Sequence, residues 1–537
     1  MTVPMAFDCA FKAGTHSEDP KTFAEAMRRP DAEKWYQAAY EEIQSLIANK
    51  TWKLAKLPPG RKAIGSRWVF VIKRKADGSI ERYKGRLVAK GYAQRPGFDY
   101  TETFAPTAKW AALRAILAMA ALEDMELESI DISSAFLNGE LEEEVYMEQP
   151  EGFHQGAYDE FLQLLKGIYG LKQAGRIWHK KLDKELQDMG FIKVQCDHSV
   201  WVFQRHGTKV IIPVFVDDMT IASKSKEMIQ SVKEELKRRF KLRDLGPTSF
   251  LLGVAIERDR SNRTLRLSQS QYILDLLARY NHSDCVPVST SMDPSCRLSK
   301  DQAPSTPEEV EHMKSIPYIH AVGSLMYLAV STCPDISYAV GVLARFNSNP
   351  GEAHWKAVKH LFKYLKGTIN YKLTYAPISN SELFVTYSDA DHGGDKSAGW
   401  STSAWVVKMG TGAISWSSKL QSMVTLSTTE AEYIAANSAG QEILWLQNLF
   451  SELGYSVEKP STLYMDNQSA VAVAKNPEHH GRLKHLDLRY YWLRDVVEEG
   501  YISPVHCPTA EMPADLLTKP LAKLKVNLGR EMLGLRE

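Results

Sequence analysis

The sequence predicts a mixed α+β fold divided into several domains, and three observations support this class. The chain has 537 residues, more than one hydrophobic core usually serves, so roughly two to four domains are expected. Strand-like runs alternate along it with apolar stretches that have helical spacing. Acidic residues follow predicted strands in two separate regions, one before and one after a helical middle section. We therefore expect two acidic sites in two different domains.

The composition is that of a globular chain. Apolar residues make up 44% and charged residues 24%, so disorder is not expected. No run of about 18 apolar residues occurs and the first residues lack a secretory pattern, so no membrane association is expected. The six cysteines are scattered without a Cys-x-x-Cys pair, which indicates a reducing compartment. A metal site at His479-His480 is disfavoured, because no cysteine lies at zinc-finger spacing nearby.

In the first half of the chain, local patterns predict a leader followed by helices and strands. Residues 1–28 are polar and aperiodic, so we expect a flexible leader. Helices are predicted at 31–47 and 110–122, and strands at 67–73 and 83–90 with a hairpin turn at Asp77-Gly78.

The second half begins with a linker and helices and then changes its pattern. Residues 293–308 are rich in Ser, Pro and Asp, as linkers are, and residues 318–346 and 354–366 have helical spacing. From Glu382 the pattern predicts three strands, a long helix, a strand, further helices, a strand and a short helix. We expect these segments: 1–28, 29–292, 293–380, 381–522 and a C-terminal tail at 523–537.

A basic segment lies between Arg61 and Arg95. It contains eleven Lys or Arg residues against two acidic ones, with aromatic residues between them. Such a segment is typical of binding to a phosphate backbone. A solvated, charged hairpin has the same composition, so this segment alone leaves both interpretations open.

Three aspartates stand at the ends of predicted strands in the first region. Asp131 lies near the end of the predicted strand 125–132. A β-branched run at 210–216 leads into Asp217-Asp218, which two apolar arms place at the tip of a hairpin. Pro213 within the first arm indicates an edge strand or a bulge.

An acidic pair in a turn is most often a turn-forming pair only. Nucleotidyl transfer, however, needs oxygen ligands for two Mg²⁺ ions about 3.5–4 Å apart. Crowded carboxylates repel one another, and a bound cation relieves that repulsion. A metal site at these aspartates is therefore one of two interpretations that the pattern permits.

A second set of acids lies in the C-terminal region. The four candidates follow strands or begin helices, and they are Asp389, Glu430, Asp466 and Asp515. Each position alone is common in ordinary folds, but four carboxylates in a βββαβ…βα order suit a two-metal site. Asp391 competes with Asp389, and Glu432 competes with Glu430. Asp389 is favoured because it directly follows its strand.

The motifs around the first set resemble those of copia-type retrotransposon Pol polyproteins. Residues 215–218 match the polymerase signature that commonly reads Tyr-x-Asp-Asp in reverse transcriptases. The resemblance covers residues 51–292 in the family's order, and its clearest segments are 68–92, 131–153 and 169–178. It implies a right-hand polymerase with fingers, palm and thumb, followed by a helical connection and a C-terminal ribonuclease H-like α/β domain.

The resemblance also implies roles for matched residues. Two Mg²⁺ ions, or Mn²⁺ in their place, are bound by Asp131, Asp217 and Asp218. Phe136 is the aromatic gate against a ribose 2′-OH, with a core aromatic as the alternative, and Gln173 contacts the incoming nucleotide. Either Lys84 or Arg86 grips its triphosphate, and Leu252-Gly253 lies where the primer-gripping segment is expected.

The C-terminal segments 387–391, 426–433, 465–470 and 514–519 resemble the family's ribonuclease H. This resemblance implies two further Mg²⁺ ions at Asp389, Glu430, Asp466 and Asp515, and Glu430 is favoured because it matches the family's Thr-Glu. His506 stands near the place of a mobile histidine, although the loop that follows is short. Residues 482–494 also resemble the family, with packing or substrate contact as their role.

The function that the resemblance implies is an RNA-directed DNA polymerase with ribonuclease H activity. Its expected partners are an RNA template, a DNA primer, dNTPs and the RNA–DNA hybrid. Integrase and capsid of the same element are expected as further partners. The expected location is a cytoplasmic virus-like particle or the nucleus. A decayed, inactive element and a non-catalytic nucleic-acid-binding protein are the alternatives. Protease and integrase motifs are absent, so we expect a processed product or a gene model of the element's 3′ portion.

Overall fold

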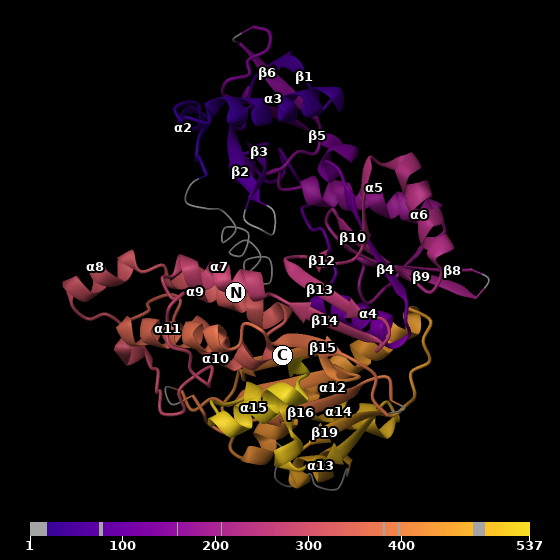
Figure 1. Ribbon diagram of the computed structural model, residues 1–537, viewed down its shortest axis with the longest axis vertical. Helices are drawn as coiled ribbons and strands as arrows, with labels where there is room; N and C mark the ends of the chain where they lie inside the picture. The colour runs from indigo at the N-terminus through magenta and orange to yellow at the C-terminus, as the bar shows by residue number, and fades with distance from the viewer. Residues whose placement is uncertain are drawn as a thin grey trace.

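The computed structural model describes residues 19–74, 79–157, 159–205, 207–379, 382–395, 398–475 and 489–537. Figure 1 shows the N-terminal elements at the top and a six-stranded sheet with its helices at the right. A row of helices lies at the left, and the C-terminal elements lie at the bottom. The predicted mixed α+β, multidomain fold is confirmed.

The N-terminal lobe contains two small sheets and helix α3, which packs on strand β3 of one of them. Its elements are α2 (Phe23–Met27), α3 (Ala32–Ala48), β1 (Trp52–Lys56), β2 (Ser66–Arg74), β3 (Ile80–Ala89), β5 (Glu140–Met147) and β6 (Glu160–Lys166). The sheets have the orders β1-β6-β5 and β2-β3. Trp35 of α3 packs edge-on against Phe70 and Tyr83, and these contacts hold the helix on the basic hairpin.

The expectation of a flexible leader is wrong for residues 19–28. The Thr22 side chain caps helix α2, and the buried Phe23 contacts Trp68 and Phe153 with ring centroids 6.1 and 5.9 Å apart. Phe23, Ala26 and Met27 have helical spacing, but helix α2 has only five residues, too few for the periodicity to be recognised in a polar stretch. Residues 1–18 and the predicted turn at Asp77-Gly78 lie outside the described residues.

The six-stranded sheet has the antiparallel order β11-β4-β10-β9-β8-β7 and carries three helices. Its strands are β4 (Glu126–Ile132), β7 (Ile192–Lys193), β8 (Val200–Arg205), β9 (Thr208–Phe215), β10 (Asp218–Ser223) and β11 (Leu242–Pro247). Its helices are α4 (Trp110–Leu122), α5 (Ala174–Asp188) and α6 (Lys226–Arg239). The predicted helix at 110–122 matches α4.

The expectation of an edge strand or a bulge at Pro213 is wrong. Strand β9 lies between β8 and β10, and Pro213 pairs with Val200 of β8 without a shift of register. On the β10 side the pairing is interrupted between Val214 and Ile211. The missing N–H of proline is therefore accommodated by a local gap in the ladder.

A fourth sheet collects strands from distant parts of the chain, in the order β12-β13-β14-β15-β21. The strands are β12 (Phe250–Leu251), β13 (Val254–Asp259), β14 (Thr264–Ser268), β15 (Lys372–Tyr375) and β21 (Leu535–Arg536). The adjoining helices are α7 (Ser270–Arg279), α8 (Pro307–Ser315), α9 (Tyr318–Ser331), α10 (Ser337–Ala344) and α11 (Glu352–Gly367).

Residues 523–537 were expected to form a tail, and that expectation is wrong. Helix α15 (Lys523–Met532) and strand β21 lie there, and Leu535 of β21 pairs with Leu373 of β15. A two-residue strand is too short for any pattern to predict, and its partner lies far away in sequence. The segment boundaries themselves stay a prediction.

The C-terminal lobe is a five-stranded mixed sheet in the order β18-β17-β16-β19-β20. Its elements are β16 (Val385–Ala390), β17 (Thr402–Met409), β18 (Gly412–Leu420), α12 (Thr428–Glu452), β19 (Ser461–Met465), α13 (Gln468–Lys475), α14 (Arg489–Glu498), β20 (Ile502–His506) and the 3₁₀ helix η6 (Pro513–Leu517). Strands β16, β19 and β20 are parallel, so their C-terminal ends meet at one edge.

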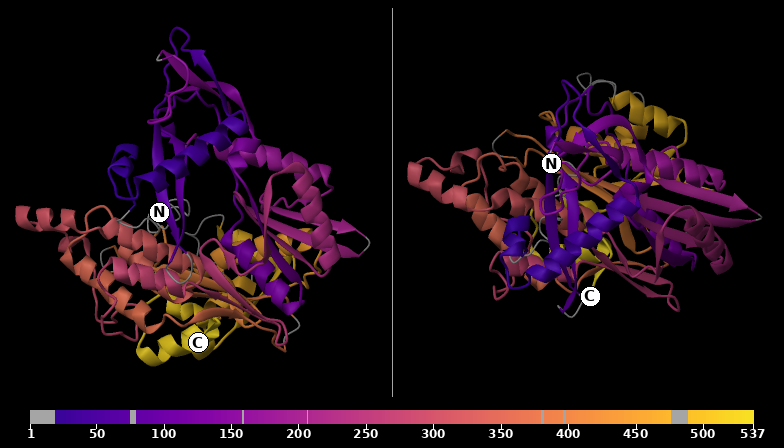
Figure 2. Two further views of the ribbon diagram at one scale, coloured as in Figure 1. Left: turned by 45° about the horizontal axis from the view of Figure 1, so that its top comes forward. Right: turned by 90° about the horizontal axis from the view of Figure 1, so that it is seen from above.

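Figure 2 shows from two further directions that this lobe lies directly against the elements of the six-stranded sheet. One hydrophobic core runs from Leu113 of α4 through Leu373 of β15 to Tyr433 of α12. Among the described residues, we find no helix whose length and apolarity would allow it to cross a bilayer.

Candidate catalytic carboxylate sites

The tip of the β9–β10 hairpin carries the first acidic pair. Phe215 pairs with Asp218, so Val216 and Asp217 form a two-residue turn. Val216 has φ = +60°, which is rare for a β-branched residue and indicates a constrained turn. The Trp178 indole N–H donates to the Val216 carbonyl at 2.7 Å and holds the turn against helix α5.

Asp131 lies beside this turn on the neighbouring strand. It is the register partner of Asp218 in the β4–β10 ladder, so the two side chains lie side by side on one face of the sheet. The Ile132 N–H donates to the Asp217 carbonyl at 3.4 Å. The structure thus brings the three predicted aspartates together.

The pKa values of the hairpin pair are raised. Burial, together with the charges of Asp217 and Asp131, raises the pKa of Asp218 to about 6. Burial also raises the pKa of Asp217, against the opposing charges of Arg86 and Lys84. Carboxylates kept close together in a buried turn cost free energy unless a cation or protons neutralise them. This turn is therefore suited to binding a cation.

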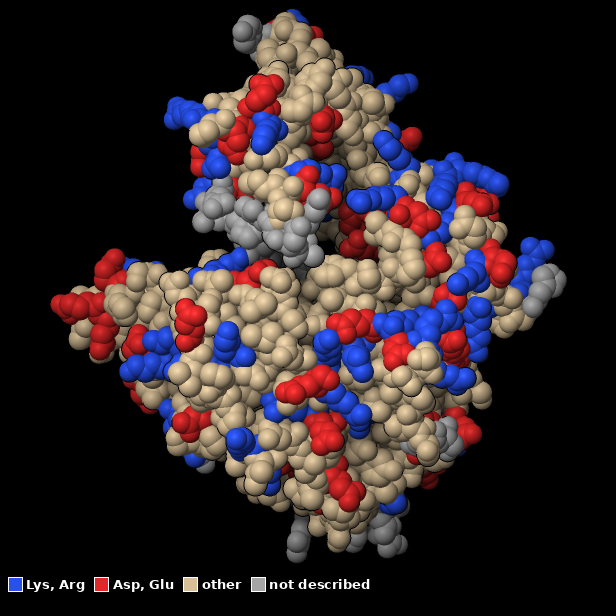
Figure 3. All heavy atoms as spheres, in the orientation of Figure 1, with Lys and Arg blue, Asp and Glu red and all other residues tan. Residues whose placement is uncertain are grey.

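Acidic side chains are visible in a hollow beside β10 in Figure 3, between the N-terminal lobe and the rest of the molecule. Lys84 and Arg86 are two residues apart on β3 and so share one strand face. Burial, then the positive charges of Arg86, Arg82 and Lys73, lowers the pKa of Lys84 to about 8. Both basic residues therefore stay candidates for the triphosphate.

Phe136 lies on a short 3₁₀ helix, Ala135–Asn138, directly after Asp131 and β4. Its ring contacts the edge of Tyr169 at 4.9 Å between centroids, and the Arg86 guanidinium lies 4.6 Å from the Tyr169 ring. Phe136, Tyr169 and Arg86 therefore form a continuous series of contacts between the segment that follows Asp131 and the basic strand β3. Phe136 is half-buried, which suits either a gate or a packing role.

The expected contact of Gln173 with a nucleotide is not supported. Gln173 is fully buried, its amide accepts from Gln94 Nε2 at 3.0 Å, and it donates to the Asp99 carbonyl at 2.9 Å. Both ends of the amide are therefore used inside the protein. The motif places Gln173 correctly near the site, but tertiary packing turns its side chain toward the loop 94–99.

The predicted primer-gripping position is a tight turn between β12 and β13. Leu252 and Gly253 both have positive φ, and the Tyr327 hydroxyl of α9 donates to the Leu252 carbonyl. A Cβ on Gly253 would lie 2.8 Å from that hydroxyl oxygen, so the close approach requires glycine.

The second cluster lies where the parallel strands of the C-terminal lobe end. Carboxylate oxygens of Asp389, Glu432 and Asp466 lie within 4.8 Å of one another, and this is the one such group in the described chain. Asp389 is at the end of β16, Asp466 follows β19, and Glu432 projects from α12, which packs on both strands. A compact set of hard oxygen donors suits a divalent cation.

Glu432, not Glu430, belongs to this cluster, so the preference for Glu430 is corrected. The Glu430 N–H bonds to Ser427 Oγ at 3.2 Å, and the Glu430 carboxylate accepts from the Leu426 N–H. Glu430 therefore caps the N-terminus of α12. Residues two apart face different sides of a helix, so only one of the two glutamates can face β16.

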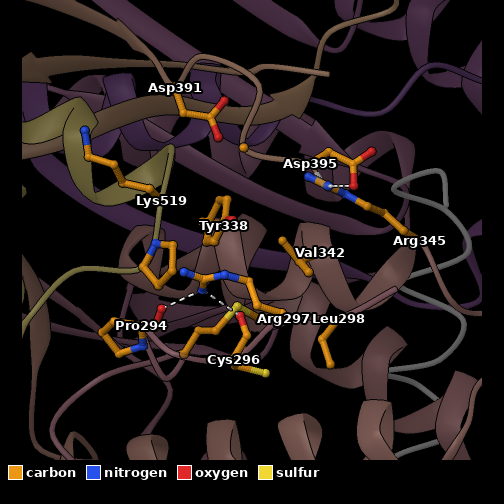
Figure 4. A pocket seen from close by; sticks show the side chains of 13 residues that line it. Pro294, Cys296, Arg297, Leu298, Tyr338, Val342, Arg345, Asp391, Asp395 and Lys519 are labelled. Carbon is orange, nitrogen blue, oxygen red and sulfur yellow. Dashed lines mark hydrogen bonds and ion pairs between the residues drawn. The ribbon is translucent and has the colours of Figure 1, made fainter. Parts of the chain in front are cut away.

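Asp389 faces the cluster, whereas its competitor Asp391 faces away from it. Asp389 accepts a hydrogen bond from Thr518 Oγ1 at 2.7 Å, and Asp391 accepts from the Thr402 N–H. Figure 4 shows Asp391 with Lys519, Tyr338 and Arg345 in the wall of a separate pocket. The preference for Asp389 over Asp391 agrees with this geometry.

Two carboxylates of this cluster, Asp389 and Glu432, have raised pKa values. Burial raises the pKa of Asp389 to about 6, and Asp515 and Asp466 add to the effect. Burial, then the charges of Asp389 and Asp466, raises the pKa of Glu432 to about 9. Without a cation the cluster therefore holds protons that an exposed carboxyl would release.

Comparison with known proteins assigns the family. Residues 49–294 match the family described as reverse transcriptase (RNA-dependent DNA polymerase). A putative transposon Ty5-1 protein of Saccharomyces cerevisiae is 32% identical over 318 residues, which is 58% of this chain and the whole of that protein. The chain belongs to the copia-type retrotransposon Pol family.

Pol polyproteins from plants match nearly the whole length of this chain. The polyprotein from transposon TNT 1-94 of Nicotiana tabacum is 42% identical over 96% of the chain, and that from transposon RE1 of Arabidopsis thaliana is 40% identical over 94%. The chain spans only 39% and 34% of their lengths. A solved foamy viral protease-reverse transcriptase in complex with double-stranded DNA is 12% identical over 89% of this chain and 70% of its own, with a TM-score of 0.47, too low to support an inference.

The fourth predicted acid of this Pol chain lies at the edge of the second cluster. Asp515 on η6 forms an ion pair with Lys519, and its charge raises the pKa of Asp389, but it is not among the three clustered carboxylates. His506 ends β20 opposite Met465 and is exposed next to Asp466. His479-His480 and residues 482–488 lie outside the described residues.

The sequence patterns did not predict two threonines that donate hydrogen bonds to the second cluster. Thr518 donates to Asp389, and Thr509 Oγ1 donates to Asp466 Oδ2 at 3.0 Å. Thr518 lies inside the motif 514–519, and that motif could have identified it as a residue of the site. Thr509 lies in the loop after β20, and only the parallel pairing of β19 with β20 brings it to Asp466.

Proposed function

We propose that this chain copies RNA into DNA at the Asp131–Asp217–Asp218 site and cleaves the RNA of the resulting hybrid at the Asp389–Glu432–Asp466 cluster. The observation that carries the proposal is the presence, in one member of this family, of two separate carboxylate clusters, in which Asp218 and Glu432 have raised pKa values. Each lies at the end of a strand in its own sheet.

Two Mg²⁺ ions at each site are the proposed cofactors, with Mn²⁺ as a substitute. The donor sets fit, because they consist of carboxylate oxygens whose charges are costly in the metal-free state. Asp131, Asp217 and Asp218 would hold the metals of the polymerase site. At the second site Asp389, Glu432 and Asp466 would hold them, with Asp515 as the fourth ligand after its ion pair with Lys519 opens. The bound metals would activate the attacking oxygen and stabilise the leaving one.

The protein's own residues orient the substrates in this proposal. Lys84 and Arg86 bind the triphosphate of the dNTP, and Phe136, held by Tyr169, lies against its sugar. Gln173 positions the loop 94–99 and does not contact the nucleotide. The hybrid's A-form backbone and 2′-OH groups, not its sequence, are recognised.

The proposed partners are an RNA template, a DNA primer, the RNA–DNA hybrid and dNTPs. Integrase and capsid of the same element are further proposed partners. The retrotransposon Pol relatives support a cytoplasmic virus-like particle, with later entry to the nucleus, as the place of action.

Extension of a DNA primer on an RNA template, with Mg²⁺ and with EDTA, tests the proposal. Asp217→Asn should abolish extension and spare hybrid cleavage, and Asp466→Asn should do the reverse. Asp391→Asn is the matched control and should retain both activities within about threefold, because it faces the separate pocket.

Absence of both activities in folded wild-type protein would contradict the proposal. Steeply salt-dependent binding that does not need Mg²⁺ would then support a non-catalytic nucleic-acid-binding protein instead.

A further inference from the structure

Arg114 is a buried cation that joins three parts of the molecule. It lies on α4, one of the helices of the six-stranded sheet, and is only 3% exposed. Its Nε donates to the Ile414 carbonyl of β18 at 2.7 Å, and its Nη1 donates to the carbonyls of Val330 and Ser331 at the end of α9. All these acceptors are main-chain oxygens in other lobes.

An aromatic ring completes this contact. The guanidinium lies 3.7 Å from the centroid of the Trp416 ring, and the Trp416 indole N–H donates to the Ala329 carbonyl at 2.9 Å. Burying a cation without a carboxylate partner is costly unless its donors are satisfied. The rigid fork of arginine satisfies several carbonyls at fixed angles, which favours a role in fixing geometry.

A second contact lies at the far end of helix α12. The Trp445 indole N–H donates to the Cys196 carbonyl at 3.0 Å, and the Glu452 carboxylate accepts from the Gln195 and Cys196 N–H groups. Lys209 of β9 donates to the Gly454 carbonyl at 3.0 Å. The C-terminal end of α12 is thus bound to the sheet that carries Asp217.

Helix α12 links this contact to the second acidic cluster. Glu432 near its start belongs to the cluster, and Glu452 at its end binds the loop before β8 of the six-stranded sheet. The twenty residue steps from Glu432 to Glu452 span about 30 Å at 1.5 Å per residue. Arg114 holds β18 and α9, and the end of α12 holds the loop before β8. The C-terminal lobe is therefore held at two separate places, which restricts its rotation.

We propose that Arg114 and the C-terminal end of α12 are positioning elements that hold the two sites at a fixed separation. On this inference, which rests on the proposed function, RNA is cut within a narrow window of distances behind the primer terminus. Neither element touches substrate, so their loss alters where the RNA is cut more than how fast DNA is made.

The test uses the full chain on an end-labelled RNA template with a chain-terminated DNA primer, and it maps the cut positions at single-nucleotide resolution. Arg114→Met should widen the window of cut positions at least about twofold and leave extension within about twofold of wild type. The double variant Trp445→Phe/Glu452→Gln acts on the second contact and should widen the window in the same way.

Gln447→Met is the matched control. Gln447 also lies on α12 and donates to a carbonyl, that of Tyr501, but within the C-terminal lobe, so the window should stay narrow. An unchanged window in both interface variants, or dispersed cuts by the wild type, would overturn the inference.

Hydrogen exchange of the free protein separates this inference from the proposed function. Arg114→Met should speed exchange of the Gln195 and Cys196 amides, far from the substitution, even if no activity is found. Unchanged exchange at both amides would count against a coupled pair of contacts. If Arg114→Met fails to fold, the Trp445→Phe/Glu452→Gln variant still gives the map of cut positions.

Discussion

At the scale of single residues, Glu430 and Glu432 show how a motif can be located correctly and assigned wrongly. The sequence places both at the start of a helix and cannot reveal the rotation of that helix against the sheet. The structure shows Ser427 and Glu430 closing the helix N-terminus, while Glu432 faces Asp389. Capping and metal-ligand preferences favour the same residue type, so local chemistry could not separate the two.

Glu432→Gln should therefore lower hybrid cleavage at least about a hundredfold and leave primer extension unchanged, because it removes one anionic donor from the proposed site. Glu430→Gln should retain cleavage and lower the free energy of unfolding by about 1 kcal/mol, as loss of a helix cap does. Cleavage assays and urea unfolding of both variants measure this. Loss of cleavage in Glu430→Gln alone would show that the assignment is reversed.

The raised carboxyl pKa values predict a pH-dependent response to Mg²⁺. A group with a raised folded-state pKa keeps a proton that the unfolded chain has lost, so the metal-free fold loses stability as pH rises from about 4 through 6 to about 9. Mg²⁺ replaces those protons and should raise Tm more near pH 8 than near pH 5. Thermal melts with and without Mg²⁺ at both pH values measure this, and an equal shift at both would contradict it.

At the scale of elements, the glycine at position 440 is explained by the packing around α12. Glycine in the middle of α12 costs about 1 kcal/mol in helix propensity. A Cβ there would lie 3.1 Å from Leu493 of α14, and 3.3 Å from both Trp492 and Ile502. The glycine therefore permits α14 and β20 to pack closely on α12.

Gly440→Ala should lower stability despite the better helix propensity of alanine. Crowding in a packed core costs about 1–3 kcal/mol, which exceeds the propensity gain of about 1 kcal/mol. Urea unfolding gives the sign directly. Gly175→Ala is a matched change. Its Cβ would meet only Ala105, at 3.3 Å, so this variant should be tolerated better. Stabilisation of Gly440→Ala would show that Leu493 moves aside freely.

At the scale of the whole molecule, the order of strands and helices was predictable because each depends on patterns of a few residues. The helix at 110–122 and the strand ends at Asp131, Asp217, Asp389 and Asp466 are examples. What could not be predicted depends on contacts between distant segments. The burial of Gln173 against the loop 94–99 and the pairing of β15 with β21 both belong to this kind.

Leu535→Ala should test the importance of this distant pairing. Leu535 is buried on β21, the edge strand of the fourth sheet, and truncating such a leucine costs about 2–5 kcal/mol. Hydrogen exchange of β15 amides should become faster, while the amides of β9 and β10 should keep their protection. Uniformly unchanged exchange would show that β21 contributes little.

Strand β21 also has a consequence for the order of folding during synthesis. Its partner β15 leaves the ribosome about 160 residues earlier, which at 5–20 residues per second is a delay of about 8–30 s. Throughout that interval the β15 edge of the fourth sheet is unpaired. The nascent protein therefore exposes an open strand edge, which invites pairing with other chains, until translation reaches residue 536.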